Sequence, residues 1–158
     1  MMRIGILSDS HDNIPKLEKA VRFFNKHKVG FVFHAGDFIA PFTIRVLNAL
    51  NCDWRGVFGN NDGEQKGLAS VSKSRIQQGP LRVEMEGKRI VLIHDLNQIN
   101  SKTKEADLII FGHTHKSEIL RQRAKLMVNP GECGGWLYGK STIALINLDS
   151  LSVTIHKI

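Results

Sequence analysis

Short apolar runs alternate with polar loops along the chain, and these runs define the strands that we expect. Each run is short, contains mostly branched or aromatic apolar residues and is bounded by polar residues, as strands buried inside α/β proteins are. The runs lie at residues 4–7, 31–33, 54–58, 90–93 and 108–111. The pattern therefore predicts a sheet structure whose central strands are buried on both faces.

Two gaps between these runs carry the apolar spacing of a helix. The first helix is predicted to begin at Asp12-Asn13 with Pro15 nearby, because both features are helix start signals. Its apolar positions are Ile14, Leu17, Val21 and Phe24. The second is predicted to begin at Pro41. Its apolar positions are Ile44, Leu47 and Leu50. The chain therefore begins β-α-β-α-β.

The second half of the chain is predicted to be richer in hairpins. Residues 81–85 and 88–93 flank Glu86-Gly87, and Asp149-Ser150 separates a similar pair of apolar runs. Residues 62–80 are the least readable part of the chain. We expect an α/β fold of mixed sheets, with parallel strands early and antiparallel strands late.

Length and composition narrow the class of protein. A chain of 158 residues with 42% hydrophobic content is of the size of one domain, which we place at residues 1–158. Cys52 and Cys133 are too few for a disulfide framework, which favours a reducing compartment. The first apolar run is too short for a signal peptide or a membrane span. We expect a soluble, cytoplasmic protein.

The formal net charge of +7 favours an anionic partner. A phosphate ester, a nucleic acid or an acidic surface all fit this charge. The alternative is a basic surface that binds no ligand, and charge alone does not decide between them.

The residues able to bind metal follow the five apolar runs. They are Asp9, His11, Asp37, Asn60, His94, His113 and His115. In open α/β sheets ligands bind beyond the carboxyl ends of the strands, so these side chains are expected to converge there. Each motif alone is common: Asp-x-His and Gly-Asp often mark simple turns. Their joint placement at the ends of successive runs is what indicates a site.

The ligand types restrict the metal. Imidazole, carboxylate and carboxamide together suit Mn, Fe, Zn or Ni, and they differ from the all-oxygen set of a Ca site or the thiolates of a structural Zn site. Seven ligands exceed the need of one ion. Two ions about 3.5–4 Å apart, sharing one carboxylate, would use them all and would supply a metal-bound hydroxide at neutral pH. Such a cluster would attract a phosphate.

In this order, the motifs resemble the blocks of the calcineurin-like metallophosphoesterase superfamily. The matching motifs are Asp9-Ser10-His11, Gly36-Asp37, Gly59-Asn60, His94 and Gly112-His113-Thr114-His115. The short chain, with Asn129-Pro130-Gly131 after the last of them, is similar to the small YfcE-type phosphodiesterases. The resemblance implies two mixed β-sheets packed as a sandwich and flanked by helices. It also implies that the Asn-Pro-Gly turn closes beside the site, a plain surface turn being the alternative.

The resemblance also implies a ligand set for each ion. The first ion would be held by Asp9, His11, Asp37 and His115. The second would be held by Asp37, Asn60, His94 and His113. Asp37 is then the bridge, and Asn60 binds through its amide oxygen. The expected cofactors are two divalent ions, with Mn or Ni favoured and Fe, Zn or Mg as alternatives.

Two positions depart from the family pattern. Asn61 stands where many members have a catalytic His, and because Asn cannot titrate, cleavage of esters with poor leaving groups is expected to be slower by about 10²–10⁴. Asp95 stands where Gly is frequent. Its carboxylate is expected either to orient a ligand His or to be a solvated loop acid.

Further residues near the motifs have less certain roles in the sequence. Glu132 and Cys133 are expected at the rim of the site. Trp136 and Tyr138 are candidates to stack on a substrate base, although aromatic residues in such a segment more often cover a core or an oligomer interface. His34 either orients Asp37 or packs under the site.

The sequence supports an enzyme over two alternatives. The expected substrate is a small phosphate ester, which includes nucleotides. One alternative is a protein-interaction scaffold of the same fold, as in retromer, but all seven ligand positions retain metal-binding side chains. The other is a nuclease, motivated by the net charge. A homo-oligomer is compatible with the sequence, and no membrane association is expected.

Overall fold

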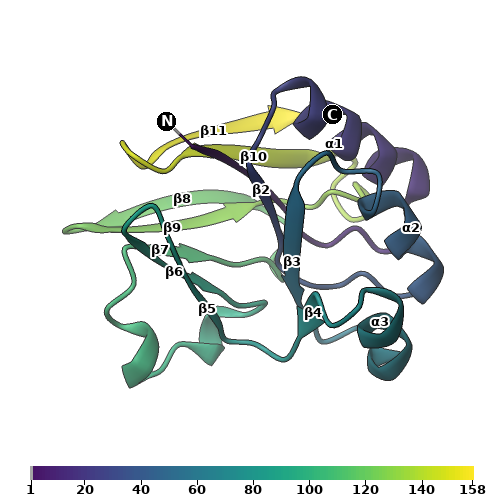
Figure 1. The fold of residues 1–158 in the computed structure, drawn as a ribbon, viewed down its shortest axis with the longest axis horizontal. Coiled ribbons are helices and arrows are strands. Elements are labelled where there is room, and N and C mark those ends of the chain that lie inside the picture. The colour runs from purple at the N-terminus through teal and green to yellow at the C-terminus, as the bar shows by residue number, and fades with distance from the viewer. Residues whose placement is uncertain (1) are drawn as a thin grey trace.

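The computed structural model describes residues 2–158, with the side chain of Lys102 excepted, and shows two β-sheets with helices on one side (Figure 1). The first sheet has the order β11-β10-β1-β2-β3-β4. Its strands are β1 (Arg3–Leu7), β2 (Phe31–His34), β3 (Asp53–Val57), β4 (Ile76–Gln77), β10 (Thr142–Asn147) and β11 (Ser152–Lys157). Strands β1 to β4 are parallel, whereas β10 and β11 add an antiparallel edge.

The second sheet is also mixed and has the order β5-β6-β7-β9-β8. Its strands are β5 (Leu81–Met85), β6 (Lys88–Leu92), β7 (Leu108–Ile110), β8 (Ser117–Gln122) and β9 (Lys125–Pro130). The central strands β6, β7 and β9 are parallel, and hairpins place β5 and β8 antiparallel at the two edges. The expected fold of two mixed sheets is confirmed.

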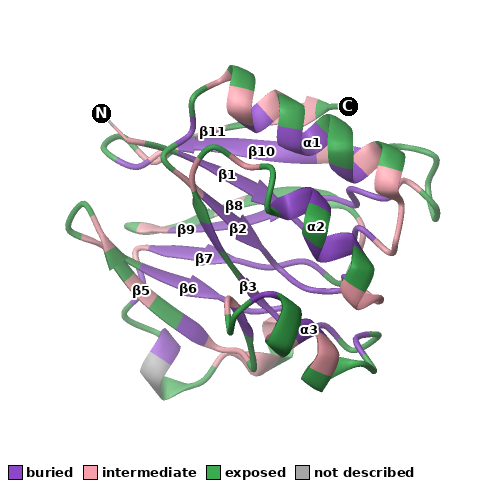
Figure 2. Cartoon of the chain, turned by 45° about the vertical axis from the view of Figure 1, so that its right-hand side comes forward, coloured by how far each residue is buried: buried purple, intermediate pink, exposed green. Residues whose placement is uncertain are grey.

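The two sheets pack against each other through one apolar cluster. Members from the first sheet include Ile4, Ile6, Phe33, Val57 and Ile146. Members from the second include Ile90, Leu92, Leu108, Ile110 and Val128. Figure 2 shows the central strands buried, while the helices carry both buried and exposed residues. Burial on both faces explains why these strands lack polar alternation in the sequence.

Three helices cover the outer face of the first sheet. They are α1 (Ile14–Lys26), α2 (Ile44–Leu47), which continues a 3₁₀ turn at Pro41–Thr43, and α3 (Gln65–Val71). Helix α1 buries Leu17, Ala20, Val21 and Phe24. Asn13 caps it by accepting a hydrogen bond from the backbone N–H of Lys16. The start signal at Asp12-Asn13 is thereby confirmed.

Several elements differ from the sequence prediction. Helix α2 ends at Leu47, so Leu50 lies beyond it. The strands β8 and β9, helix α3 and the short strand β4 were not predicted. Asn129 and Pro130 belong to β9, and the turn itself is made by Gly131, which has a φ of 84°. Of the three residues predicted to form a turn, the first two are therefore the end of a strand, and the turn begins at Gly131.

A separate apolar cluster lies on the outer face of the second sheet. It contains Val91, Ile93, Ala106, Ile109, Phe111 and Met127, with Leu96 and Ile99 packed against it. The loop of short 3₁₀ turns between β6 and β7 thus takes the place that helices have on the first sheet. No helix among the described residues is both long and apolar enough to cross a bilayer.

Candidate metal centre

The side chains able to bind metal gather where strands of both sheets end. Strands β1, β2 and β3 lead to four of them, which are Asp9, His11, Asp37 and Asn60. Strands β6 and β7 lead to the other three, which are His94, His113 and His115. The structure brings all seven into one region, as the distances below show. The interface between the two sheets therefore ends in this cluster.

The first group consists of Asp9, His11, Asp37 and His115. One possible ligand atom from each lies within 4.8 Å of every other. Nε2 of His11 is 3.4 Å from Oδ2 of Asp37, and Nε2 of His115 is 3.3 Å from Oδ1 of Asp9. Both carboxylates are buried, with 0% exposure for Asp9 and 1% for Asp37. Two buried carboxylates beside two imidazoles form a donor set suited to a divalent transition metal.

Unsatisfied atoms in this group support a cation there. Oδ1 of Asp9 and Nε2 of His11 are buried and have no hydrogen-bond partner among the described residues. Buried polar atoms are normally paired, and an orphaned one costs free energy. Because both atoms belong to the first group, a bound divalent cation would satisfy them together. The residues present therefore fit a metal ion.

The second group consists of Asp37, Asn60, His94 and His113. Oδ1 of Asn60 lies 2.8 Å from Nε2 of His94 and 3.0 Å from Nδ1 of His113. Nε2 of His94 is also 3.6 Å from Oδ2 of Asp37. Asp37 therefore belongs to both groups through the same oxygen.

The tautomer of His94 points to the same conclusion for this group. Its Nδ1 lies 2.7 Å from the carbonyl oxygen of Ala35, which only accepts hydrogen bonds, so Nδ1 carries the proton. In the neutral ring, Nε2 then presents a lone pair toward Oδ1 of Asn60 and Oδ2 of Asp37. Three acceptors facing one another repel unless a proton or a cation lies between them. A divalent ion removes that repulsion, and the carbonyl of Ala35 fixes the ring for it.

The charges of the first group perturb their own ionisation. Burial raises the pKa of the Asp9 carboxyl, but interactions with the side chains of His11 and Ser8 outweigh burial and bring its pKa below the ordinary value. Asp9 in turn raises the pKa of His11, although burial opposes this. The surroundings of the His11 ring therefore favour a positive charge there.

Asp62 holds two of the ligand loops together, and the sequence patterns did not single it out. Its buried carboxylate accepts hydrogen bonds from the backbone N–H groups of Asp37, Ile39 and Gly59, at 3.0, 2.8 and 2.8 Å. Burial raises the pKa of Asp62 despite these bonds. The signal that would have found it is its place directly after Gly59-Asn60-Asn61, but its partners across the chain are visible only in three dimensions.

The backbone around the ligands is tightly constrained. Left-handed φ angles occur at Asp9, His11, Asp37, His113 and His115. Such angles cost non-glycine residues on the order of 1 kcal/mol each and concentrate at functional sites. Gly59 packs so closely on Asp37 that a Cβ there would overlap the carboxylate. Gly36 has a φ of 101°, whereas Gly59 is needed for close approach.

Comparison with known protein families gives one match that spans nearly the whole chain. The model of the calcineurin-like phosphoesterase superfamily domain matches residues 2–151.

The chain belongs to the calcineurin-like phosphoesterase superfamily.

Relatives within this superfamily include proteins of similar length. Phosphodiesterase MJ0936 of Methanocaldococcus jannaschii is 34% identical over 156 residues, covering 94% of each chain. A probable metallophosphoesterase of Methanothermobacter thermautotrophicus is 32% identical over 141 residues, covering 82% of this chain and 76% of the relative. The expectation of a hydrolase that acts on phosphoric esters is confirmed.

Solved structures extend the comparison. The structure of an archaeal phosphodiesterase has a TM-score of 0.92 and 32% identity, covering 99% of this chain and 100% of the other. The phosphoesterase YfcE of E. coli has a TM-score of 0.71 at 18% identity, covering 99% and 98% of the two chains. At that identity the likeness to YfcE shows the shared fold. The resemblance to the superfamily inferred from sequence motifs is thus confirmed.

Asn61, which directly follows Asn60, contacts Asp37 twice. Its side-chain amide donates to Oδ2 of Asp37 at 2.8 Å, and its backbone N–H donates to Oδ1 at 2.9 Å. Asn61 is itself exposed. Its amide thus supports the carboxylate that both ligand groups share.

Asp95 is a loop acid, and its contact with His113 is longer than a hydrogen bond. Its carboxylate accepts a hydrogen bond of 2.9 Å from the backbone of Asn97 and so caps the 3₁₀ turn Leu96–Gln98. Oδ2 of Asp95 also lies 3.8 Å from Nε2 of His113. Asp95 is therefore a loop cap that faces a ligand His.

His34 is packed beneath the metal centre and does not contact Asp37 in the hydrogen bonds observed. Its Nδ1 accepts from the backbone N–H of Gly36, so Nε2 carries the proton and donates to Oγ of Ser10 at 2.9 Å. The ring also stacks on Phe38. Burial lowers the pKa of His34 to about 3, so the ring stays neutral.

Glu132 and Cys133 lie deeper than the expected rim position. Both are buried, with exposures of 1% and 0%. Oε1 of Glu132 is 3.3 Å from Nδ1 of His115, which places this carboxylate behind a ligand of the first group. Trp136 and Tyr138, by contrast, are exposed.

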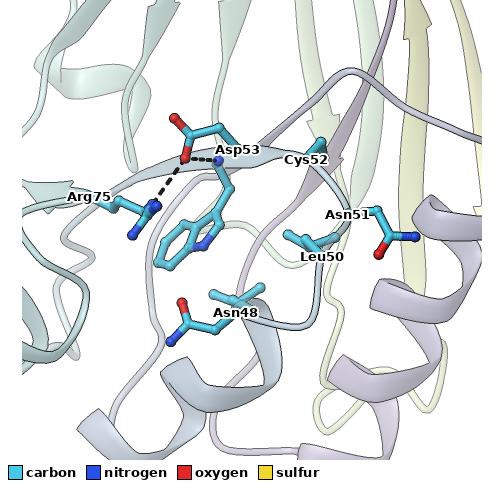
Figure 3. Close-up of a pocket in the computed structure, with 8 residues that line it drawn as sticks. Asn48, Leu50, Asn51, Cys52, Asp53 and Arg75 are labelled. Atoms are coloured by element: carbon cyan, nitrogen blue, oxygen red, sulfur yellow. Dashed lines mark hydrogen bonds and ion pairs between the residues drawn. The ribbon is translucent and has the colours of Figure 1, made fainter.

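A separate cavity lies at the amino end of β3, away from the carboxyl ends that carry the metal centre (Figure 3). Figure 3 shows Arg75 reaching Asp53 across it, and their ion pair measures 3.0 Å. The same carboxylate accepts the backbone N–H of Trp54. Since the charged groups of this cavity are already paired with each other, it is a poor candidate for the active site.

Proposed function

We propose that this chain is a divalent-metal-dependent phosphodiesterase with a two-ion site. The observation that carries the proposal is the position of Oδ2 of Asp37, which lies 3.4 Å from Nε2 of His11 and 3.6 Å from Nε2 of His94. One carboxylate oxygen therefore faces a ligand of each group. This is the arrangement that a bridging carboxylate requires.

The ligand sets of the proposal follow these two groups. The first ion would be held by Asp9, His11, Asp37 and His115, and the second by Asp37, Asn60, His94 and His113. When bound, two such ions supply positive charge for the phosphate and a nucleophile at neutral pH. The mixture of nitrogen and oxygen ligands supports Mn or Ni, with Fe, Zn or Mg as alternatives.

The remaining polar groups around the site explain what kind of ester it would cleave. Asn61 does not titrate, so it supplies no proton to a leaving group. Its contribution is to hold Asp37 through the amide hydrogen bond. We infer that esters with good leaving groups are cleaved faster than esters with poor ones. The phosphodiesterase relative supports a diester as the substrate, and nucleotides that contain a phosphodiester bond fit this class.

Two further features bear on the setting of the proposed enzyme. Cys52 and Cys133 are both free thiols, which supports the proposal of a reducing, cytoplasmic location. The net charge of +7 supports an anionic substrate. It also keeps a nuclease as the second candidate, and steeply salt-dependent binding of a DNA or RNA oligomer would favour that candidate.

Hydrolysis by metal-stripped protein tests the proposal. Bis-p-nitrophenyl phosphate and p-nitrophenyl phosphate would be assayed with Mn, Ni, Zn and Mg restored separately. We expect no activity without metal and a preference for the diester with at least one ion. Asp37→Asn should lose this activity, whereas Asp53→Asn, in the distant cavity, should retain it. Activity that persists without metal, or absence of activity with every ion, would overturn the proposal and favour a scaffold.

A further inference from the structure

A second cavity adjoins the first ligand group. It has a volume of about 460 Å³, and His11 and His115 form part of its lining. Ile39, Trp136 and Leu137 also line it. This volume lies in the range of small-molecule sites, which are mostly apolar with a few polar groups at one end. A ligand with its phosphate at the metal centre would therefore extend its other end toward apolar side chains.

The apolar side chains of this cavity are unusually exposed. Trp136 is 67% and Leu137 61% exposed, and the two are consecutive in the chain. A single exposed apolar residue is ordinary, but adjoining ones beside a cavity are typical of a ligand-binding surface.

Hydrogen bonds hold this exposed segment in place. The buried carboxylate of Glu132 accepts hydrogen bonds from the backbone N–H of Trp136 at 2.7 Å and of Leu137 at 3.0 Å. The indole N–H of Trp136 donates to the carbonyl oxygen of His11 at 3.1 Å. The indole is thus oriented by the same loop that supplies a metal ligand. Such preorganisation reduces the entropy lost on binding.

Ile39 provides an independent observation. It has a φ of 86°, a left-handed angle that is rare for a β-branched residue and costs free energy. Its side chain is only half-buried, so core packing does not account for this choice. A branched apolar side chain at such a position is explained if it contacts a ligand in the cavity.

We propose that this cavity binds a planar aromatic group esterified to the substrate phosphate, with the indole of Trp136 as its stacking surface. The inference rests on the proposed function, because it requires the phosphate to lie at the metal centre. An indole is a favourable stacking partner for any aromatic ring, including a nucleobase. The cavity would therefore select esters by their aromatic substituent.

Phosphonates test the cavity without turnover, because a carbon replaces the ester oxygen. Methylphosphonate, phenylphosphonate and the carbon-linked phosphonate analogue of adenosine 5′-monophosphate would be titrated into Mn-loaded protein by calorimetry. We expect at least one aromatic ligand to bind about tenfold more tightly than methylphosphonate. The preferred aromatic ligand identifies an aryl group or a nucleobase as the source. An aromatic ligand that stacks on Trp136 should also quench its fluorescence in the same titration. The other tryptophan, Trp54, is buried, so the ligand does not reach it.

Substitutions locate the effect. Trp136→Ala should remove the preference for aromatic ligands while leaving the affinity for methylphosphonate within about twofold. Phe42→Ala is the matched control, since Phe42 is an exposed aromatic residue that does not line the cavity. Equal affinities for all three ligands, or a preference that survives Trp136→Ala, would overturn the inference. Hydrolysis of methyl p-nitrophenyl phosphate, measured in parallel, reports separately whether the proposed function holds.

Discussion

The side-chain amide of Asn61 donates a hydrogen bond of 2.8 Å to Oδ2 of Asp37, the oxygen that both ligand groups share. Asn61 thus supports the carboxylate and, because an amide does not titrate, supplies no proton itself. This contact separates two effects of substitution, because loss of the amide disturbs Asp37 whereas gain of an imidazole adds a titratable group.

Asn61→His should therefore change the dependence of rate on the leaving group. We expect cleavage of a diester with a phenolate or alkoxide leaving group to rise by about 10²-fold, and cleavage of a p-nitrophenyl ester to change little. Asn61→Ala, which removes the amide without adding an acid, serves as the control and should lower both rates. A ratio of the two rates that is unchanged by Asn61→His would show that the proton donor is not limiting.

Substitution of the shared carboxylate should affect both ions. Asp37→Ala is expected to lose both, whereas His94→Ala should weaken mainly the second, because His94 faces only one group. Elemental analysis after gel filtration gives the metal stoichiometry, with Asp53→Asn as a control distant from the site. Two ions retained in Asp37→Ala would refute the bridge.

Glu132 should influence metal affinity through His115. Because Oε1 of Glu132 lies 3.3 Å from Nδ1 of His115, its loss is expected to weaken binding of the first ion by about 10–100-fold. Glu132→Gln keeps the size of the side chain, and calorimetric metal titration measures the change. Glu118→Gln, an exposed site on β8, is the matched control. Unchanged metal affinity in Glu132→Gln would contradict this role.

His34 should make the fold less stable as pH falls. Its folded pKa is about 3 and its unfolded pKa is about 6.5, so below pH 6.5 the unfolded chain binds a proton that the folded chain refuses. The free energy of unfolding should therefore decrease by up to about 1.4 kcal/mol per pH unit from this residue between pH 6 and 4. Urea unfolding at several pH values measures it.

The control for this prediction is His34→Gln, which cannot titrate but offers an amide in place of the ring N–H that binds Ser10. The wild-type protein should show the steeper loss of stability toward acid. Equal slopes for the two proteins would mean that His34 is protonated in the folded state or that it is compensated elsewhere.

The sequence predicted those helices and strands whose apolar residues, read along the chain, are the ones that the fold buries. Helix α1 was found because Asn13, Pro15 and a row of apolar residues all indicate the same helix. Strands β8 and β9 were missed because five of the six residues of β8 are exposed and offer no apolar alternation. The two strands form a local hairpin, with Ile119 opposite Val128, but the residues between them, Arg123 and Ala124, are not turn residues that would indicate it.

The candidate site divides in a similar way. The seven side chains able to bind metal were singled out because each follows an apolar run, and the structure places them together. Asp62 was not recognised as a support, because it bonds the backbone of another loop. Glu132 was not recognised either, because its contact with the ring of His115 joins residues that are distant in the sequence. The sequence also offered no means of telling that Trp136 is exposed beside the metal centre and that Cys133 is buried.

The ligands come from the ends of strands in both sheets, with Asp9 and Asp37 from the first and His94 and His115 from the second. A metal ion bound by this set would link the two sheets, in addition to the apolar cluster that packs between them. Because an ion that binds only the folded state adds to its stability by mass action, chelation should loosen the sandwich as a whole. The melting temperature would then rise as more of the metal site is occupied.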